Sequence, residues 1–337
     1  MNWDTALPVI WFGVIGFSIL MYVLLDGFVL GLGILAPFAE DENQLDNMMN
    51  TAAPIWDGNE TWLVLGGNAL LAAFPRAFGI ILSGLYLPVL LMVLALVFRG
   101  VAFEFRFKAV RGKPWWGAAF ALGSTFAAFA QGLILGAVVE GMPLQEGKYV
   151  GGAFAWFSPF SMLTGVAVVF GYALLGSCWL ILKTEGRLQR IARTLTRPLV
   201  LVVVAFMGLV SAWLPFLDSR IMARWFEGAN FWWLAPVPVL ALANAFALWR
   251  VSMHEGREAL PFVLTLCFFG LGFAGLVLGV WPNIVPPALT IWEAASPRSS
   301  QMFVAVGLAV LLPVILGYTW WSYRVFSGKV AADAGYH

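Results

Sequence analysis

Charged side chains interrupt otherwise apolar segments in the first third of the chain. They are Asp26, Asp57, Glu60, Arg99 and Glu104. An ionised side chain at the centre of a membrane helix costs roughly 2.5–3.5 kcal/mol, so it usually faces protein or a water path. Carboxylates with an arginine at membrane depth can form a proton path, because each member can hold a proton or a charge while water bridges the gaps. These residues therefore predict a proton path.

The segment 54–75 carries the densest group of these polar residues. Asp57 and Glu60 are three residues apart, so they share one face of a helix. Asn59 lies between them, and Trp56 and Trp62 flank the group. An interfacial helix end is an alternative interpretation, because tryptophans and acidic residues are common there. Asn68 disagrees with that alternative, since it carries polarity about two turns further along.

A structural role for the same charges also stays open. In that interpretation the charges form an ion-paired cluster that pins the helices together, with Arg99 neutralising Asp57. A relay role and a packing role are compatible with each other.

The composition predicts a polytopic membrane protein. Of the 337 residues, 61% are hydrophobic and only 11% are charged, whereas about a quarter of the residues of soluble domains are charged. The formal net charge of +1 gives no support for nucleic-acid binding. Connections between the apolar segments are too short for a soluble domain, so we expect one membrane domain over residues 1–337.

Metal and haem ligands are scarce. Cys178 and Cys267 lie in apolar segments, and His254 and His337 lie in polar ones. No spacing of these residues is typical of a metal site, and membrane haems normally require buried His or Met ligands. We therefore expect no metal ion and no haem to be bound by this chain alone.

Apolar segments of about 20 residues predict membrane-spanning helices. The sequence predicts an all-α protein with about nine of them, near residues 8–37, 53–74, 77–98, 117–139, 158–182, 198–217, 230–249, 260–281 and 301–323.

Basic residues then predict the orientation. If the N-terminus lies outside, inward connections hold 14 of the 19 Lys and Arg residues and outward ones hold 5. The positive-inside rule therefore favours an outer N-terminus and a cytoplasmic C-terminus. In that orientation the four carboxylates and Arg99 converge on the inner half of the first three helices.

Three further motifs predict local structure. Gly27 and Gly31 form a small-xxx-small pair that permits close helix approach, and Gly66–Gly67 is expected to act likewise. Basic residues within 106–113, ahead of Trp115 and Trp116, favour an anchor in the inner headgroup layer with lipid contact. The proline-rich segment 281–297 cannot be helical throughout.

These motifs resemble those of subunit II of the cytochrome bd-type quinol oxidases, most closely the cyanide-insensitive branch. The resemblance spans almost the whole chain. It rests on DGFVLGLG at 26–33, PIWDGNETWL at 54–63, AFP at 73–75, FRGVAFEFR at 98–106 and PNIVPPALTIWEAAS at 282–296.

The resemblance implies a partner, a localisation and a division of labour. A haem-bearing subunit I would carry the quinol site, haem b and a d-type haem or a b-type replacement, while this subunit packs against it in the bacterial inner membrane. The complex would oxidise quinol and reduce O2 to water, and cytoplasmic protons would pass along this subunit, contributing to proton-motive force. A small single-helix subunit, lipids and a bound quinone are further possible partners.

Carried over by motif, the proton route comprises Asp57, Asp26, Glu104, Arg99 and Glu60. Trp56, Trp62 and Asn59 are then expected near the subunit interface or the haem environment. Where the family often has a second carboxylate, this chain has Val29, so the upper part of the route is expected to differ. Without the resemblance, the residues favour a secondary transporter with an intramembrane carboxylate, and a structural scaffold is a third hypothesis.

Overall fold

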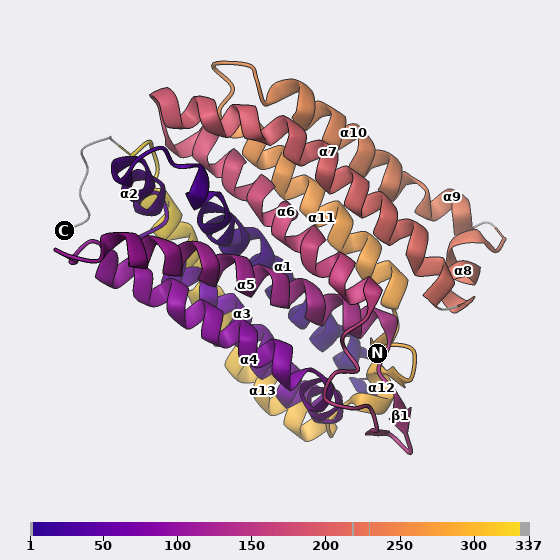
Figure 1. Ribbon diagram of the computed structural model, residues 1–337. Helices are drawn as coiled ribbons and strands as arrows, with labels where there is room; N and C mark the ends of the chain where they lie inside the picture. The colour runs from indigo at the N-terminus through magenta and orange to yellow at the C-terminus, as the bar shows by residue number, and fades with distance from the viewer. Residues whose placement is uncertain (1–2, 218, 229, 331–337) are drawn as a thin grey trace.

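Long helices lie side by side and form almost the whole of this protein (Figure 1). The computed structural model describes residues 3–217, 219–228 and 230–330. The long helices are α1 (Trp3–Leu35), α3 (Trp56–Ala73), α4 (Pro75–Arg106), α5 (Lys113–Glu140), α6 (Pro159–Lys183), α7 (Gly186–Leu217), α10 (Pro236–Val251), α11 (Ala259–Val280) and α13 (Arg298–Val325). The predicted all-α class is confirmed.

Short elements connect the long helices. They are η1 (Ala36–Phe38), α2 (Glu42–Asn50), β1 (Leu144–Gln145), β2 (Lys148–Tyr149), α8 (Ser219–Phe226), α9 (Asn230–Leu234), β3 (Asn283–Val285), β4 (Leu289–Thr290) and α12 (Ile291–Ala294). The strands form two small antiparallel pairs, β1 with β2 and β3 with β4. As predicted, the segment 281–297 is not helical throughout.

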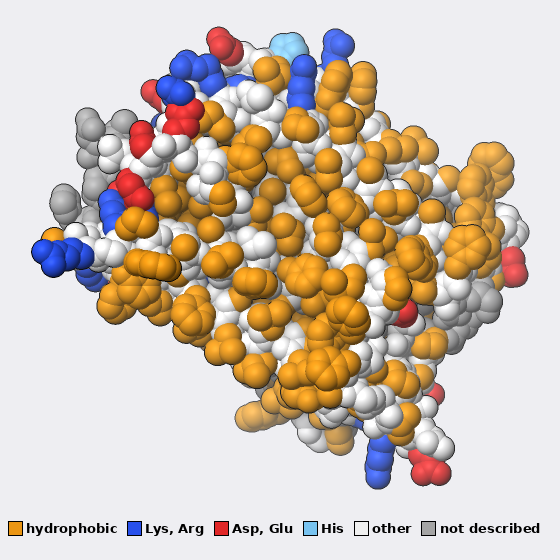
Figure 2. Space-filling model, viewed as in Figure 1, with side chains coloured by type: hydrophobic (Ala, Val, Ile, Leu, Met, Phe, Trp, Pro, Cys, Tyr) orange, Lys and Arg blue, Asp and Glu red, His pale blue; other side chains and the backbone are white. Residues whose placement is uncertain are grey.

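In the described part of the chain, eight segments are long and apolar enough to cross a membrane. Figure 2 shows the corresponding surface, with apolar side chains over the middle of the visible face and charged ones gathered toward its ends. The segment expected at 53–74 does form a helix, α3, but its polar residues keep it out of these eight. The count of nine spans and the orientation remain predictions.

Glycines allow α1 to lie directly against α6. A Cβ atom on Gly31 would stand 1.9 Å from the carbonyl oxygen of Tyr172, so only glycine fits there. One turn earlier, a Cβ on Gly27 would meet the Tyr172 ring at 2.9 Å. The predicted close-approach role is thus confirmed for this pair. It holds less well for the second pair, because Gly66 faces Ser18 whereas Gly67 has nothing within 4 Å.

Arg106 is buried in an ion-paired cluster, which corrects the expectation that it anchors the chain in the headgroup layer. Its guanidinium binds Glu42 and Asp46 of α2 and donates to the Lys113 carbonyl oxygen at 2.8 Å. Lys113 binds Asp46 as well. We call these four side chains the α2 cluster. Lys108, Arg111 and Trp115 are exposed, so the anchor interpretation survives only for them.

Backbone contacts define the two ends of the bundle. At one end the Ser296 amide donates to the Ala73 carbonyl at 2.8 Å. At the other end the Val330 amide donates to the Lys183 carbonyl at 2.9 Å. There Lys329 also binds Glu258, and this hydrogen bond, with a second one from Gln189, lowers the pKa of the Glu258 carboxyl group.

Candidate functional site

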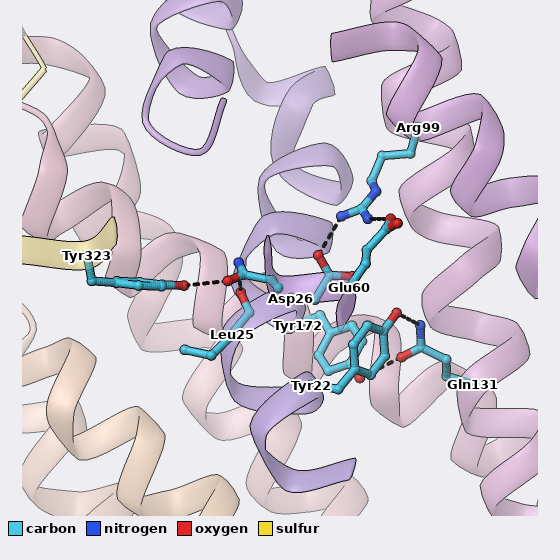
Figure 3. Close-up of polar contacts among 9 residues, drawn as sticks. Tyr22, Leu25, Asp26, Glu60, Arg99, Gln131, Tyr172 and Tyr323 are labelled. Carbon is cyan, nitrogen blue, oxygen red and sulfur yellow. Dashed lines mark hydrogen bonds and ion pairs between the residues drawn. The ribbon is translucent and has the colours of Figure 1, made fainter. Parts of the chain in front are cut away.

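Three charged side chains from three helices meet inside the bundle (Figure 3). Arg99 of α4 donates through Nη1 to Asp26 Oδ1 of α1 at 2.7 Å and through Nη2 to Glu60 Oε1 of α3. The side chains of Arg99 and Asp26 are fully buried, whereas that of Glu60 is 29% exposed. We call these three residues the Arg99 trio.

Neighbouring residues fix the position of the guanidinium. The Trp56 ring centroid lies 5.6 Å from Arg99 Cζ, a cation–π distance, and the indole stacks on Phe103 with centroids 5.2 Å apart. Behind the arginine, Gly123 of α5 allows a close approach, since a Cβ there would lie 3.0 Å from the Arg99 amide nitrogen. Packing on both sides therefore holds Arg99 between the two carboxylates.

The charges of the trio do not balance. Two carboxylates and one guanidinium, all ionised, leave one net negative charge at a largely buried site. An unpaired charge away from water is costly, so the trio has the capacity to hold one proton between its carboxylates. An arrangement of this kind can both join helices and accept a proton.

Asp57 lies just outside the trio, at the surface of this chain. Its side chain is exposed, and among the described residues it forms no hydrogen bond or ion pair. It is three residues before Glu60 on α3, and the two carboxylates are close enough to interact electrostatically. The acidic groups thus form a graded series, from exposed Asp57 through partly exposed Glu60 to buried Asp26.

Two of the expected placements require correction. The pairing of Arg99 with Asp57 is wrong, because Asp26 and Glu60 occupy the guanidinium. Glu104 does not join the trio either: its side chain is 58% exposed and lies 3.5 Å from Lys108. One turn and a half of helix carries Glu104 past Arg99 and round to a solvent-facing side of α4.

Two of the three residues expected near a subunit interface lie inside this chain. Trp62 is fully buried, with its ring 5.6 Å from that of Phe17. Asn59 is also buried, where it donates to the Leu25 carbonyl at 2.8 Å and accepts from the Tyr323 hydroxyl at 3.0 Å. Asn59 therefore ties α3 to α1 and α13. Trp56 is half-buried over Arg99.

Sequence reasoning missed the polar neighbours of the trio. The Gln131 amide of α5 donates to the Tyr22 hydroxyl at 2.8 Å and accepts from the Tyr172 hydroxyl at 2.7 Å (Figure 3). Tyr22 precedes Asp26 by four residues, which places both on one face of α1. That spacing, together with a lone glutamine in an apolar segment, was the available signal.

A haem site finds no support among the described residues. His254, the histidine they include, is exposed in the connection after α10, with Nδ1 2.8 Å from the Arg250 carbonyl oxygen. His337 lies outside the described residues. No group of three or more His, Cys, Asp or Glu residues in the described ranges could hold a metal ion. The expectation that the chain alone binds no haem stays a prediction.

Comparisons with known proteins agree on one family. The family model for cytochrome bd terminal oxidase subunit II matches residues 7–326. The chain is 29% identical to cytochrome bd ubiquinol oxidase subunit 2 of Bacillus subtilis (strain 168), over 96% of each chain. It is 26% identical to cytochrome bd-I ubiquinol oxidase subunit 2 of Escherichia coli (strain K12), over 97% of this chain and 96% of that protein.

A solved structure shares the fold. The bd oxidase from Geobacillus thermodenitrificans contains a chain that superposes with a TM-score of 0.81 at 18% identity, covering 95% of this chain and 98% of that one. Since the family model covers nearly the full length, this chain belongs to the cytochrome bd terminal oxidase subunit II family.

Proposed function

We propose that this chain is the accessory subunit of a quinol:oxygen oxidoreductase in the bacterial inner membrane. It packs against a haem-bearing subunit I. Protons from the cytoplasm pass into the membrane through Asp57 and the Arg99 trio. The printed names of the Bacillus subtilis and Escherichia coli relatives, both ubiquinol oxidase subunits, support the activity of the complex. The proton uptake that accompanies O2 reduction then contributes to proton-motive force.

The observation that carries the proton route is the graded burial of its carboxylates. Asp57 is exposed, Glu60 is 29% exposed, and Asp26 is fully buried against Arg99. A proton taken up by Asp57 can reach the neighbouring Glu60 through bridging water, and the unbalanced charge of the trio favours its retention there. Glu104 and its partner Lys108 are exposed at the C-terminal end of α4. There they add charge near Asp57, the proposed entrance for protons.

The exposed face of α3 supports a protein partner. Exposed residues recur along it at a spacing of three and four, namely Asp57, Thr61, Val64, Asn68 and Leu71, and Gly67 is exposed beside Asn68. That spacing makes one continuous stripe along the helix. Asp57 and Asn68 would be costly against lipid, so a second protein surface is the better cover for this stripe. We assign the stripe to the contact with subunit I.

The redox groups belong to the partner in this proposal. Haem b and a d-type haem, or a b-type haem in its place, supply electron transfer and O2 binding when bound in subunit I. This chain supplies helices and carboxylates beside them. A small single-helix subunit, lipids and a quinone complete the proposed set of partners, with quinol as the substrate of the complex.

One variant, with one matched control, tests the proton route. Glu60→Gln keeps the size of the side chain and its contact with Arg99 but removes the titratable proton. Glu42→Gln makes the same change in the α2 cluster, where Glu42 binds Arg106. We expect a complex with full haem content in both cases, with slow O2 reduction only in Glu60→Gln. Wild-type turnover of a fully assembled Glu60→Gln complex would contradict the proposed proton route.

Co-purification tests the partnership itself. A tagged form of this chain is expected to bring down a haem-containing subunit, and the same chain expressed without that subunit is expected to show no Soret band. A stoichiometric Soret band on the isolated chain would contradict the division of labour. A stable oligomer of this chain alone, with no haem protein attached, would instead favour a transporter or a scaffold.

A further inference from the structure

An unused hydrogen-bond donor stands beside an unused acceptor on α1. Asp26 Oδ2 is buried and has no hydrogen-bond partner among the described residues. The Tyr22 hydroxyl accepts from Gln131 Nε2 at 2.8 Å, and its own proton has no assigned acceptor in the described part of the chain. The two groups are four residues apart on one helical face and close enough to interact electrostatically.

The amide of Gln131 decides which way this proton points. Its Oε1 accepts from the Tyr172 hydroxyl at 2.7 Å, which leaves Nε2 to donate to Tyr22. A tyrosine hydroxyl has one proton to give. If the amide were reversed, Tyr22 would donate to Gln131 and have nothing left for Asp26. Only the observed orientation leaves a donor for the buried carboxylate oxygen.

We infer that Tyr172, Gln131 and Tyr22 form a one-directional chain of hydrogen-bond donors that ends on Asp26 Oδ2, which makes Tyr22 a positioning residue. The chain keeps Asp26 ionised, so the proton held by the trio resides on Glu60. This inference rests on the proposed proton route and assigns the mobile proton within it.

The groups around Asp26 show why a hydrogen bond from Tyr22 is needed to keep it ionised. Charged or titratable groups face it from α4 (Arg99), α3 (Glu60), α6 (Tyr172) and α13 (Tyr323), besides Tyr22 on its own helix. Burial by itself favours a neutral carboxyl group, and Asp26 is the more buried of the two acids. A second donor on Asp26, in addition to Arg99, reverses that preference in favour of Glu60.

Protonating Glu60 rather than Asp26 suits a relay. Glu60 is partly exposed and adjoins Asp57, so it can exchange protons with the entrance. Asp26 stays as the fixed counter-ion that keeps Arg99 in place. A hydrogen bond to a charged group changes a proton distribution by roughly 10- to 100-fold, which is enough to decide between two neighbouring carboxylates.

Infrared difference spectroscopy of the purified oxidase complex can locate the proton. The carbonyl stretch of a protonated carboxylic acid is assigned to Glu60 or to Asp26 by its shift in frequency in Glu60→Asp or in Asp26→Glu, because both changes keep the charge of the trio. In the wild-type complex we expect a band that belongs to Glu60. In Tyr22→Phe we expect this band to weaken and a band that belongs to Asp26 to appear, with a loss of turnover and an unchanged haem spectrum.

Two further variants keep the test decisive. Tyr172→Phe removes the hydroxyl that holds the Gln131 amide but keeps the Tyr22 hydroxyl, so it is expected to cause a smaller transfer of the same kind, and it replaces Tyr22→Phe if that complex does not assemble. Tyr323→Phe is the matched control: its hydroxyl donates to Asn59 Oδ1 rather than to a carboxylate, so the carboxyl bands are expected to stay as in the wild type.

The outcomes distinguish the role of Tyr22 from the proton route itself. A wild-type band that belongs to Asp26, or unchanged bands in the Tyr22 and Tyr172 variants, would overturn the inference. If the Glu60→Gln complex reduces O2 slowly while those bands are unchanged, only the role of Tyr22 is contradicted. If a fully assembled Glu60→Gln complex turns over at the wild-type rate, the proposed proton route itself is contradicted.

Discussion

Helix α4 carries two buried arginines, and their surroundings differ in one decisive way. Arg99 and Arg106 are both fully buried, each between two carboxylates. They are seven residues apart, which is about 10 Å along the helix. In the α2 cluster Lys113 adds a second positive charge, so the cluster is neutral. The Arg99 trio has no second cation and keeps one negative charge.

Access to water differs as well. In the α2 cluster the side chains of Glu42 and Lys113 are 51% and 33% exposed, so solvent screens the charges. In the trio only Glu60 has partial access. A neutral, partly solvated cluster fixes the short helix α2 to the bundle. An unbalanced, buried cluster with one exposed edge can take up a proton. The comparison therefore separates an arginine in a neutral, partly solvated cluster from one in a buried cluster that carries a surplus negative charge.

The largest effect is expected for Arg99→Gln. The variant leaves Asp26 and Glu60 without a counter-ion, and losing one partner of a buried ion pair costs about 3–5 kcal/mol. We expect the complex to lose most of its haem, measured as absorbance per unit of membrane protein. Wild-type haem content would show that the trio is not a buried charge site.

Asp26→Asn is expected to be the next most severe. It removes the fully buried counter-ion of Arg99 but leaves Glu60, so the trio becomes neutral and loses its capacity for a proton. We expect partial assembly, with turnover per haem reduced further than in Asp57→Asn. This ranking follows from the structure, because Asp26 is the fully buried partner of Arg99 whereas Asp57 is exposed and does not bind it. Equal turnover per haem in Asp26→Asn and the wild type would show that the surplus charge of the trio is not needed for turnover.

Asp57→Asn is expected to separate assembly from turnover. Since Asp57 does not bind Arg99, its replacement leaves the trio intact. The haem spectrum should remain that of the wild type while O2 reduction slows by about tenfold, or about 1.4 kcal/mol in the barrier. Haem content and quinol oxidase rate are measured on one purified sample. An unchanged rate would exclude Asp57 as the entrance.

Arg106→Gln is expected to have a smaller effect, on stability alone. Lys113 still neutralises Asp46, and the exposed Glu42 can turn to water. We expect the thermal unfolding midpoint of the complex to fall slightly, consistent with about 1 kcal/mol for a solvent-screened pair, and turnover per haem to be unchanged. A specific loss of turnover here would erase the difference between the two arginines.

A topology measurement checks which side supplies the protons. Asp4 and Ser327 are replaced singly by Cys in a background that lacks Cys178 and Cys267, and intact cells are labelled with an impermeant thiol reagent. We expect labelling at position 4 only, because the 14 to 5 division of basic residues places the N-terminus outside. Labelling at position 327 only would put the α2 cluster and the entrance at Asp57 on the outer side.

Much of the fold could be predicted from the sequence, because lipid-spanning helices require long apolar segments. Helix α3 was predictable despite Asp57 and Glu60, because the apolar segment after them is long enough to complete a helix. The small helix α2 was missed because polar residues dominate it and its position depends on Arg106 and Lys113, which are distant in sequence.

The members of the site were predictable, but their pairing was not. Asp26, Glu60 and Arg99 could be selected because charged residues are rare in apolar segments. Which carboxylate meets Arg99 depends on helix rotation, and a rotation of one residue moves a side chain by about 100°. That rotation turned Asp57 outward and Glu60 inward. Gln131 and Tyr172 could not be linked to Asp26, because nothing local to them shows that α5 and α6 pack around α1.

The rate of proton uptake during the reaction with O2 shows whether Glu60 lies on the proton route. Fully reduced oxidase, wild type or Glu60→Gln, is mixed with O2 in a weakly buffered solution that contains a pH indicator, while haem oxidation is followed in parallel. We predict that in Glu60→Gln proton uptake becomes slower than in the wild type and than in the Glu42→Gln control, although the three proteins have the same haem content. Proton uptake at the wild-type rate in Glu60→Gln would contradict the assignment of the Arg99 trio to the proton route.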